Sequence, residues 1–420
     1  MHRVCNIKIY ILLFSIIFLG GIAVQSQPYS ILIKGGYVID PKNNINSLMD
    51  VAITDGKITK VAKNIDASQA KEVVNATGMF ITPGLIDLHG HVFAGTEPDH
   101  AYSNGFSSVP PDGFYQRVGV TTVVDAGGAG WKSFPTFKKN IIDNSQMRVL
   151  SFLNIVGEGM RGGIYEQNVA DMDPDMASKA ARQYKNYIVG IKVAHFTGHS
   201  YINVDRGVEA GKLANIPVMV DFGGTTPPLS IEELFMKHLR PGDIFTHTFG
   251  QLLDTKEAIV DTVTKTLKPF VLAAQKRGII FDVGYGGSSF TYSQAIPAAK
   301  AGFHPNTIST DLHINSMKSS MKDMLSVMSK FLELGMDLPA VIRASTWSPA
   351  LAINREELGH LSVGAIADVS VFTLRQGKFG FYDLAGYKME GNRKLECEMT
   401  IIGGKIVYDL NGIVSPLPTQ

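Results

Sequence analysis

The chain has 420 residues, of which 45% are hydrophobic, and its 39 Lys and Arg residues nearly balance its 38 Asp and Glu residues. This length and composition favour a large hydrophobic core in one principal domain, accompanied by a smaller second domain. Because the charge is balanced, the sequence shows no basic surplus of the kind that indicates a nucleic-acid partner.

Residues 1–26 have the layout of a secretory signal peptide. Basic residues precede an apolar run over 9–24, and small Ser26 follows at a suitable cleavage point. The run is shorter than the roughly 20 residues that a membrane-spanning helix needs, so an uncleaved anchor is the weaker alternative. The sequence therefore predicts a periplasmic or secreted protein with no membrane attachment after cleavage. Cys397 would then be the only cysteine, which excludes an internal disulfide and a thiolate zinc site.

Two segments near the ends of the predicted mature chain share the sequence pattern of a small β-domain. Residues 29–81 read as short strands separated by turns, and residues 364–407 resume the same pattern. We expect the two segments to pair into one β-sandwich domain. Residues 27–82 would form its N-terminal part and residues 356–420 its C-terminal part.

Between these segments, residues 83–355 alternate short apolar runs with helix-like stretches, the pattern of βα units around a parallel sheet. Helical spacing covers 205–215 and 254–277, and Gly278 is a suitable C-cap. Eight such strands can close into a barrel, so the predicted fold class is α/β, with a (β/α)₈ TIM-like barrel. Active sites of this fold lie at the C-terminal ends of the strands. The predicted strands are 85–91, 120–126, 149–156, 190–196, 217–222, 243–249, 279–283 and 307–312.

The first barrel strand ends in His89-Gly90-His91. Side chains two residues apart on a strand point to the same face, so these histidines can offer two imidazoles to one metal ion. Other strand ends also carry ionisable side chains, which we expect to converge at the same edge of the barrel. These residues are Asp125, Lys192, Asp221, His247 and Asp311.

Motifs along most of the chain resemble those of the amidohydrolase superfamily, and more narrowly its deacetylase or dihydroorotase-like branch, related to D-aminoacylases. The matching segments are 31–36, 84–91, 119–127, 190–193, 242–247, 308–313 and 364–369. The resemblance implies a metal-dependent hydrolase with one or two divalent ions, zinc in the first instance and manganese as the alternative. Two such ions share a hydroxide and clamp the reacting carbonyl.

The resemblance also assigns metal ligands. His89 and His91 would hold the first ion, and His247 would bind the second. Lys192 occupies the position of a lysine that carbon dioxide carboxylates to bridge both ions, a reaction that needs the neutral amine favoured by burial. Asp311 would bind metal and act as the catalytic base that takes the proton of the attacking water.

The fifth strand departs from the family pattern, because Asp221 stands where a histidine is expected. Aspartate still binds zinc or manganese through oxygen, as a harder, anionic ligand. Three readings stay open: Asp221 completes the second site, His195 or His199 supplies the missing nitrogen, or the second site is weak or empty. Asp125 more simply holds backbone near the second strand.

Two loops offer candidate substrate contacts. Arg161, in the glycine-rich loop after the third strand, could fork onto a carboxylate, although an ordinary solvent-facing arginine fits equally well. Tyr285 or Ser288, in the glycine-rich loop 284–290, could bind a reacting oxygen, unless the loop is simply flexible. His313, next to Asp311, is a further candidate near the substrate.

The leading interpretation is a metal-dependent deacetylase that removes an acyl group, acetyl in the first instance, from the amide or ester of a small molecule. A cyclic amide hydrolase of the dihydroorotase or hydantoinase kind is the first alternative, although a pyrimidine pathway step fits poorly with export. A catalytically silent binding protein on the same barrel is the second, motivated by Asp221. The expected partner is a small acylated substrate, and a homo-oligomer is left open.

Overall fold

The computed structural model describes residues 27–94, 107–252 and 254–415. The predicted signal peptide therefore lies outside the described residues. Within them, no helix is both long and apolar enough to cross a membrane.

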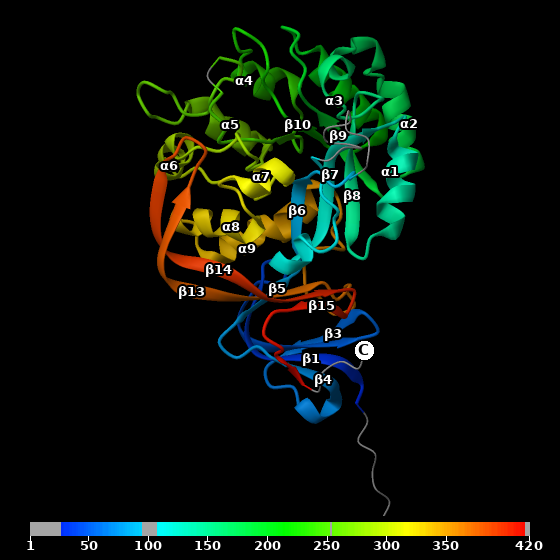
Figure 1. The fold of residues 1–420 in the computed structure, drawn as a ribbon, viewed down its shortest axis with the longest axis vertical. Helices are drawn as coiled ribbons and strands as arrows, with labels where there is room; N and C mark the ends of the chain where they lie inside the picture. The colour runs from blue at the N-terminus through cyan, green and yellow to red at the C-terminus, as the bar shows by residue number, and fades with distance from the viewer. Residues whose placement is uncertain (1–26, 95–106, 253, 416–420) are drawn as a thin grey trace, which may run out of the picture.

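A curled parallel sheet forms the centre of the larger domain, with its strands adjacent in chain order (Figure 1). Its strands are buried along their whole length or nearly so, as expected when helices cover a parallel sheet. They are β6 Leu85–Gly90, β7 Val120–Gly130, β8 Arg148–Asn154, β9 Ile188–Val193, β10 Val218–Val220, β11 Ile244–Phe245 and β12 Ile280–Phe281.

The eighth predicted strand, residues 307–312, is not a regular strand, yet it closes the barrel. Thr307 makes a parallel bridge to Asp282 after β12, and Leu312 makes one to Gly90 of β6. The segment thus joins the two edges of the seven-stranded sheet. The predicted barrel architecture is confirmed, with an eighth segment held by single bridges in place of a ladder.

Helices surround this barrel. Predicted helix 205–215 is α3 Ile202–Ala214, whereas the helix expected in 254–277 begins only at α5 Pro269–Arg277, where proline supplies the fixed φ of a first turn. Gly278 caps α5 with a φ of 107°, as predicted. The others are α1 Phe134–Asn140, α2 Pro174–Gln183, α4 Ile231–Glu233, α6 Tyr292–Lys300, α7 Ile314–Lys318, α8 Met324–Glu333, α9 Leu338–Ser345 and α10 Trp347–Ala352.

The two flanking segments pair into one nine-stranded sheet beside the barrel (Figure 1). β5 of the N-terminal segment runs antiparallel to β13 of the C-terminal segment, and β4 pairs with β16. Ile33, Val51, Val371 and Ile401 lie in its buried core. The strands are β1 Tyr29–Asp40, β2 Ile45–Thr54, β3 Lys57–Ala62, β4 Ala70–Asn75, β5 Phe80–Pro83, β13 Val369–Tyr382, β14 Lys388–Ile402, β15 Lys405–Asp409 and β16 Val414–Ser415.

Strands β13 and β14 are longer than the rest and extend from the β-domain alongside the barrel (Figure 1). Ser329 of α8 accepts a hydrogen bond from the backbone N–H of Leu395, and Glu333 pairs with Arg393 at 3.0 Å. These contacts tie the β-domain to the helical layer of the barrel.

Candidate metal centre

A cavity of about 510 Å³ opens at the C-terminal end of the barrel strands. Its described walls come from the ends of β9, β10 and β11 and from the loops after β12 and the eighth segment. Most of the sequence-predicted site residues lie in or directly beneath this cavity. Those that line it are Asp221, His247, Ser288 and Asp311, with His195 and His313.

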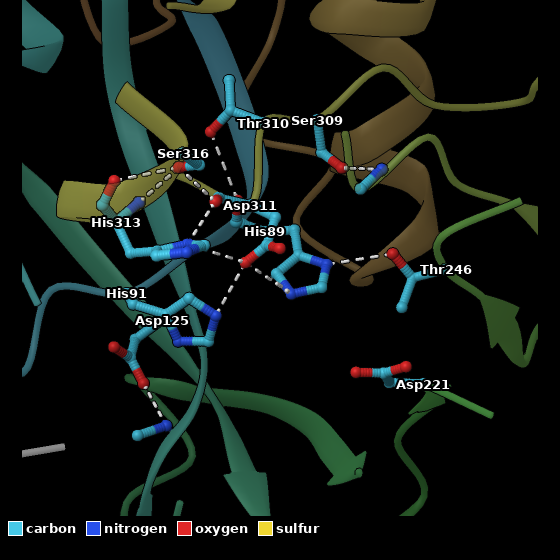
Figure 2. A network of polar contacts seen from close by, with 12 residues as sticks. His89, His91, Asp125, Asp221, Thr246, Ser309, Thr310, Asp311, His313 and Ser316 are labelled. Carbon is cyan, nitrogen blue, oxygen red and sulfur yellow. Dashed lines mark hydrogen bonds and ion pairs between the residues drawn. The ribbon is translucent and has the colours of Figure 1, made fainter. Parts of the chain in front are cut away.

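A chain of hydrogen bonds sets the direction of His89, which is almost completely buried. Its Nδ1 lies 2.9 Å from Thr246 Oγ1, and that hydroxyl donates to Asp282 Oδ2 at 2.8 Å. The Thr246 hydroxyl has one proton, which it donates to Asp282, so towards His89 it can only accept. His89 Nδ1 is therefore the donor and carries the proton. The lone pair on Nε2 then faces the centre of the site (Figure 2). Burial also holds the pKa of His89 well below its usual range, which favours the neutral ring.

The Asp311 carboxylate is the focus of several histidines (Figure 2). Its Oδ1 lies 2.9 Å from His91 Nε2, and 3.6 Å from both His89 Nε2 and His313 Nδ1. Burial opposes ionisation, but the surrounding histidines, His89 first, hold the pKa of Asp311 well below its usual range. The site therefore contains an ionised carboxylate among imidazoles.

This arrangement fits a divalent metal ion. His89, His247 and Asp311 are all buried, and each offers one ligand atom within 4.8 Å of the others. Neutral imidazole nitrogen and carboxylate oxygen are the ligands that zinc takes in the absence of cysteine. His91 lies beside this group through its 2.9 Å contact with Asp311.

Lys192 reaches the same point from β9. It is fully buried, and its Nζ lies 3.2 Å from His89 Nε2. Burial lowers the pKa of the Lys192 amine, although the charges of Asp221 and Asp311 oppose the shift. The chain thus places an amine with reduced basicity between the His89 and Asp221 sides of the site.

Asp221 and His247 form the opposite side. Asp221 Oδ2 lies 3.2 Å from His247 Nε2, while His247 Nδ1 is 2.6 Å from the Gly284 carbonyl oxygen. Burial opposes ionisation of Asp221, but His247 holds its pKa well below the usual range. The sequence-predicted neighbours Lys192, Asp221 and His247 are therefore brought together.

The two alternative histidines differ in position. His195 Nε2 lies 3.5 Å from Asp221 Oδ2, and its Nδ1 lies 3.2 Å from Glu166. Burial acts to lower the pKa of His195, but the contacts with Glu166 and Asp221 raise it to about 9. His199 is exposed and is not among the described residues that line the cavity.

Asp125 holds backbone, as predicted. Its Oδ2 accepts from the N–H groups of Val92 and Phe93 at 2.8 and 3.2 Å, and its Oδ1 accepts from Gly128 at 2.6 Å. Asp125 thereby orders the segment that follows His91.

The glycine-rich loop 284–287 forms a wall of the site. Gly284 and Gly286 have φ values of 46° and 56°, a region that side chains disfavour. A Cβ at Gly286 would overlap Asp311 Oδ2, and one at Gly284 would overlap Thr246 Oγ1. The loop therefore contains glycine because its backbone must approach the site closely, and Ser288 lines the cavity next to it.

The prediction that Tyr285 contacts substrate is wrong for this structure. Its ring is buried and stacks on Phe290 with centroids 4.4 Å apart. Its hydroxyl accepts from Lys330 Nζ at 2.7 Å and donates to the Tyr382 carbonyl at 3.0 Å. Tyr285 thus stabilises the contact with the β13–β14 hairpin and is absent from the described cavity walls.

Arg161 is engaged by its own loop. Its guanidinium contacts Glu158 at 3.2 Å and lies over the Tyr165 ring at 3.9 Å. It is not among the described residues that line the cavity. A substrate contact by Arg161 stays a prediction.

Sequence reasoning missed the residues that orient the ligands. Asp282 is buried and accepts from Thr246, Thr307 and Ser309, and Glu166 is buried beside His195. Asp282 could have been found, since it lies one residue from the end of a predicted strand. Nothing in the sequence marks Glu166.

Comparisons with known proteins agree with this fold and site. A model of the Amidohydrolase family matches residues 208–407. A deacetylase of Brucella anthropi is 32% identical over 364 residues, which cover 84% of this chain and 86% of the relative. Among solved structures, an adenine deaminase superposes with a TM-score of 0.80 at 28% identity, covering 91% of this chain and all of that one. A dihydroorotase superposes with a TM-score of 0.77 at 30% identity, covering 90% and 99%.

The fold and the histidine-carboxylate site define a TIM-barrel hydrolase that acts on carbon–nitrogen bonds. The chain belongs to the amidohydrolase family.

Proposed function

We propose that this protein is a metal-dependent deacetylase, which hydrolyses an acyl group, acetyl in the first instance, from the amide or ester of a small molecule. The observation that carries the proposal is the Asp311 carboxylate at the cavity wall, surrounded by histidines that can bind metal with it. The relatives named deacetylase support the choice of reaction, since one of them matches over most of both chains.

Zinc, or manganese as the alternative, would be held by His89, His91 and Asp311 at a first position and by His247 and Asp221 at a second, with Lys192 beside both. The metal would polarise the acyl carbonyl and acidify water. Lys192 is proposed to carry carbon dioxide as a carbamate, which its buried amine of lowered pKa favours. The carbamate would add a second anionic oxygen ligand between the two sides of the site.

Asp311 is proposed to accept the proton of the attacking water and return it to the leaving nitrogen or oxygen. A carboxylate with a lowered pKa is ionised at neutral pH and so is available as a base. His313 Nδ1 lies 2.9 Å from the Asp311 backbone oxygen, which places its ring at the cavity wall beside the base. Ser288 offers a hydroxyl to the substrate on the same side.

Turnover of a substrate panel tests the proposal. Purified protein supplied with zinc or manganese should release acetate from N-acetyl amino acids or acetyl esters faster than it opens cyclic amides such as dihydroorotate. Opening of cyclic amides without release of acetate would establish the dihydroorotase-like alternative. The structural similarity to a dihydroorotase is the reason to include cyclic amides in the panel. Metal binding without turnover of any class would favour the binding-protein alternative.

The protein is further proposed to be periplasmic or secreted. The apolar run over 9–24 after basic residues supports removal of residues 1–26 on export. N-terminal sequencing of protein recovered from the cell envelope should begin near Gln27. An intact Met1 in the membrane fraction would contradict cleavage.

A further inference from the structure

His195 is held in a defined position at the cavity edge. It follows β9 with a φ of 54°, a left-handed conformation that is uncommon for a residue with a side chain. Gln167, in the 3₁₀ turn Gly163–Gln167, donates to the His195 carbonyl and accepts from the Thr197 N–H, both at 2.8 Å. The direction of the His195 ring is therefore set by the fold.

The preceding residue of the same turn fixes the ring itself. Glu166 is 3% exposed, and both of its oxygens lie 3.2 Å from His195 Nδ1. Because a carboxylate accepts, Nδ1 donates to Glu166, and Nε2 faces Asp221 Oδ2, 3.5 Å away. Histidines that bind metal characteristically donate their other ring nitrogen to a carboxylate in this way.

His247 has the same arrangement on the other side of Asp221. Its Nδ1 is 2.6 Å from the Gly284 carbonyl, which can only accept, so Nδ1 carries a proton and Nε2 faces Asp221 Oδ2, at 3.2 Å. The Nε2 atoms of His195 and His247 thus both face one carboxylate oxygen, from the ends of β9, β11 and β10. Two imidazoles and a carboxylate are ligands that a divalent ion takes, and its binding would displace the Nε2 proton that the raised pKa of His195 favours.

We propose that His195, oriented by Glu166, is a ligand of a second divalent metal position together with Asp221 and His247. It would supply the imidazole nitrogen that the fifth strand lacks because Asp221 stands there. This inference rests on the proposed metal-dependent function, but it concerns which side chains bind the second ion rather than which substrate is turned over.

Metal stoichiometry and affinity test the proposal. Protein equilibrated with zinc should hold two equivalents, and chelator competition should give an affinity for each. His195→Ala should lose one equivalent or bind it at least 100-fold more weakly, and Glu166→Gln should weaken the same ion by about 10- to 100-fold. His199→Ala is the matched control, an exposed histidine four residues away, and should stay within twofold of the unchanged protein.

Two measurements separate this role from general destabilisation and from a protonated His195. Thermal unfolding of metal-free Glu166→Gln should match that of the unchanged protein, since the amide oxygen can still accept a hydrogen bond from His195 Nδ1. Nitrogen NMR of the zinc-loaded protein should show His195 protonated on Nδ1 only. A ring protonated on both nitrogens, two equivalents retained by His195→Ala within threefold, or fewer than two in the unchanged protein would overturn the inference. Failure to find a substrate would count against the proposed function alone.

Discussion

Asp311→Asn is expected to slow the chemical step by roughly 10²- to 10⁴-fold, the loss typical of removing a general base. Asparagine keeps the size of the side chain and one oxygen that can face His91. In the unchanged protein, His91 Nε2 lies 2.9 Å from Asp311 Oδ1. It cannot accept a proton at neutral pH. Turnover under saturating substrate, with the metal content measured on the same sample, checks this expectation.

The unchanged protein should also lose activity as the pH falls. Asp311, its neighbouring histidines and the metal-linked water take up protons as one coupled system, so the acidic limb belongs to the group and not to one residue. The Asn variant should show a flatter limb. A variant that keeps its metal and works within about threefold of the unchanged protein, a change below about 1 kcal/mol in the barrier, would place the base elsewhere, with His313 next to be tested.

Lys192→Ala is expected to abolish most activity, by about three orders of magnitude. A metal ion contributes several kcal/mol to charge stabilisation in a hydrolytic transition state, and each 1.4 kcal/mol or so corresponds to tenfold in rate. The variant removes the amine that lies 3.2 Å from His89 Nε2 and with it the proposed carbamate. Short carboxylic acids such as acetate should restore part of the activity by occupying the vacated space.

Packing must be separated from chemistry at this position, because Lys192 is fully buried beside Met219. Lys192→Met is the matched control, since it keeps an unbranched side chain without the amine. It should fold like the unchanged protein yet be inactive and resist rescue by acids. Full activity in Lys192→Met, or a mass for the active metal-loaded protein that shows no carboxylation, would contradict the proposed bridge.

The repeating βα pattern was enough to predict the barrel and to bring the main site residues to one edge. Strand ends of a parallel barrel meet regardless of the sequence between them, so His89, Lys192, His247 and Asp311 could be placed together from strand positions alone. The pairing of the two flanking segments was predictable because both read as short strands separated by turns, and β5 does pair with β13.

The tertiary structure decided which way side chains point where the strands end. His195, His247 and Asp311 have φ values of 54°, 55° and 51°, a local twist that no hydrophobic period reveals. Tyr285 points away from the cavity because its hydroxyl accepts a hydrogen bond from Lys330, which lies on α8, 45 residues later in the chain.

The partners that select each histidine tautomer were likewise invisible in the sequence. Thr246 and Asp282 orient His89, and Glu166 orients His195, from segments that only folding brings close. The sequence by itself determined the types of the site residues and the strand end at which each of them lies. Only the tertiary structure decided their hydrogen-bond partners, because a buried polar group is satisfied by whatever donor or acceptor the packed chain places next to it.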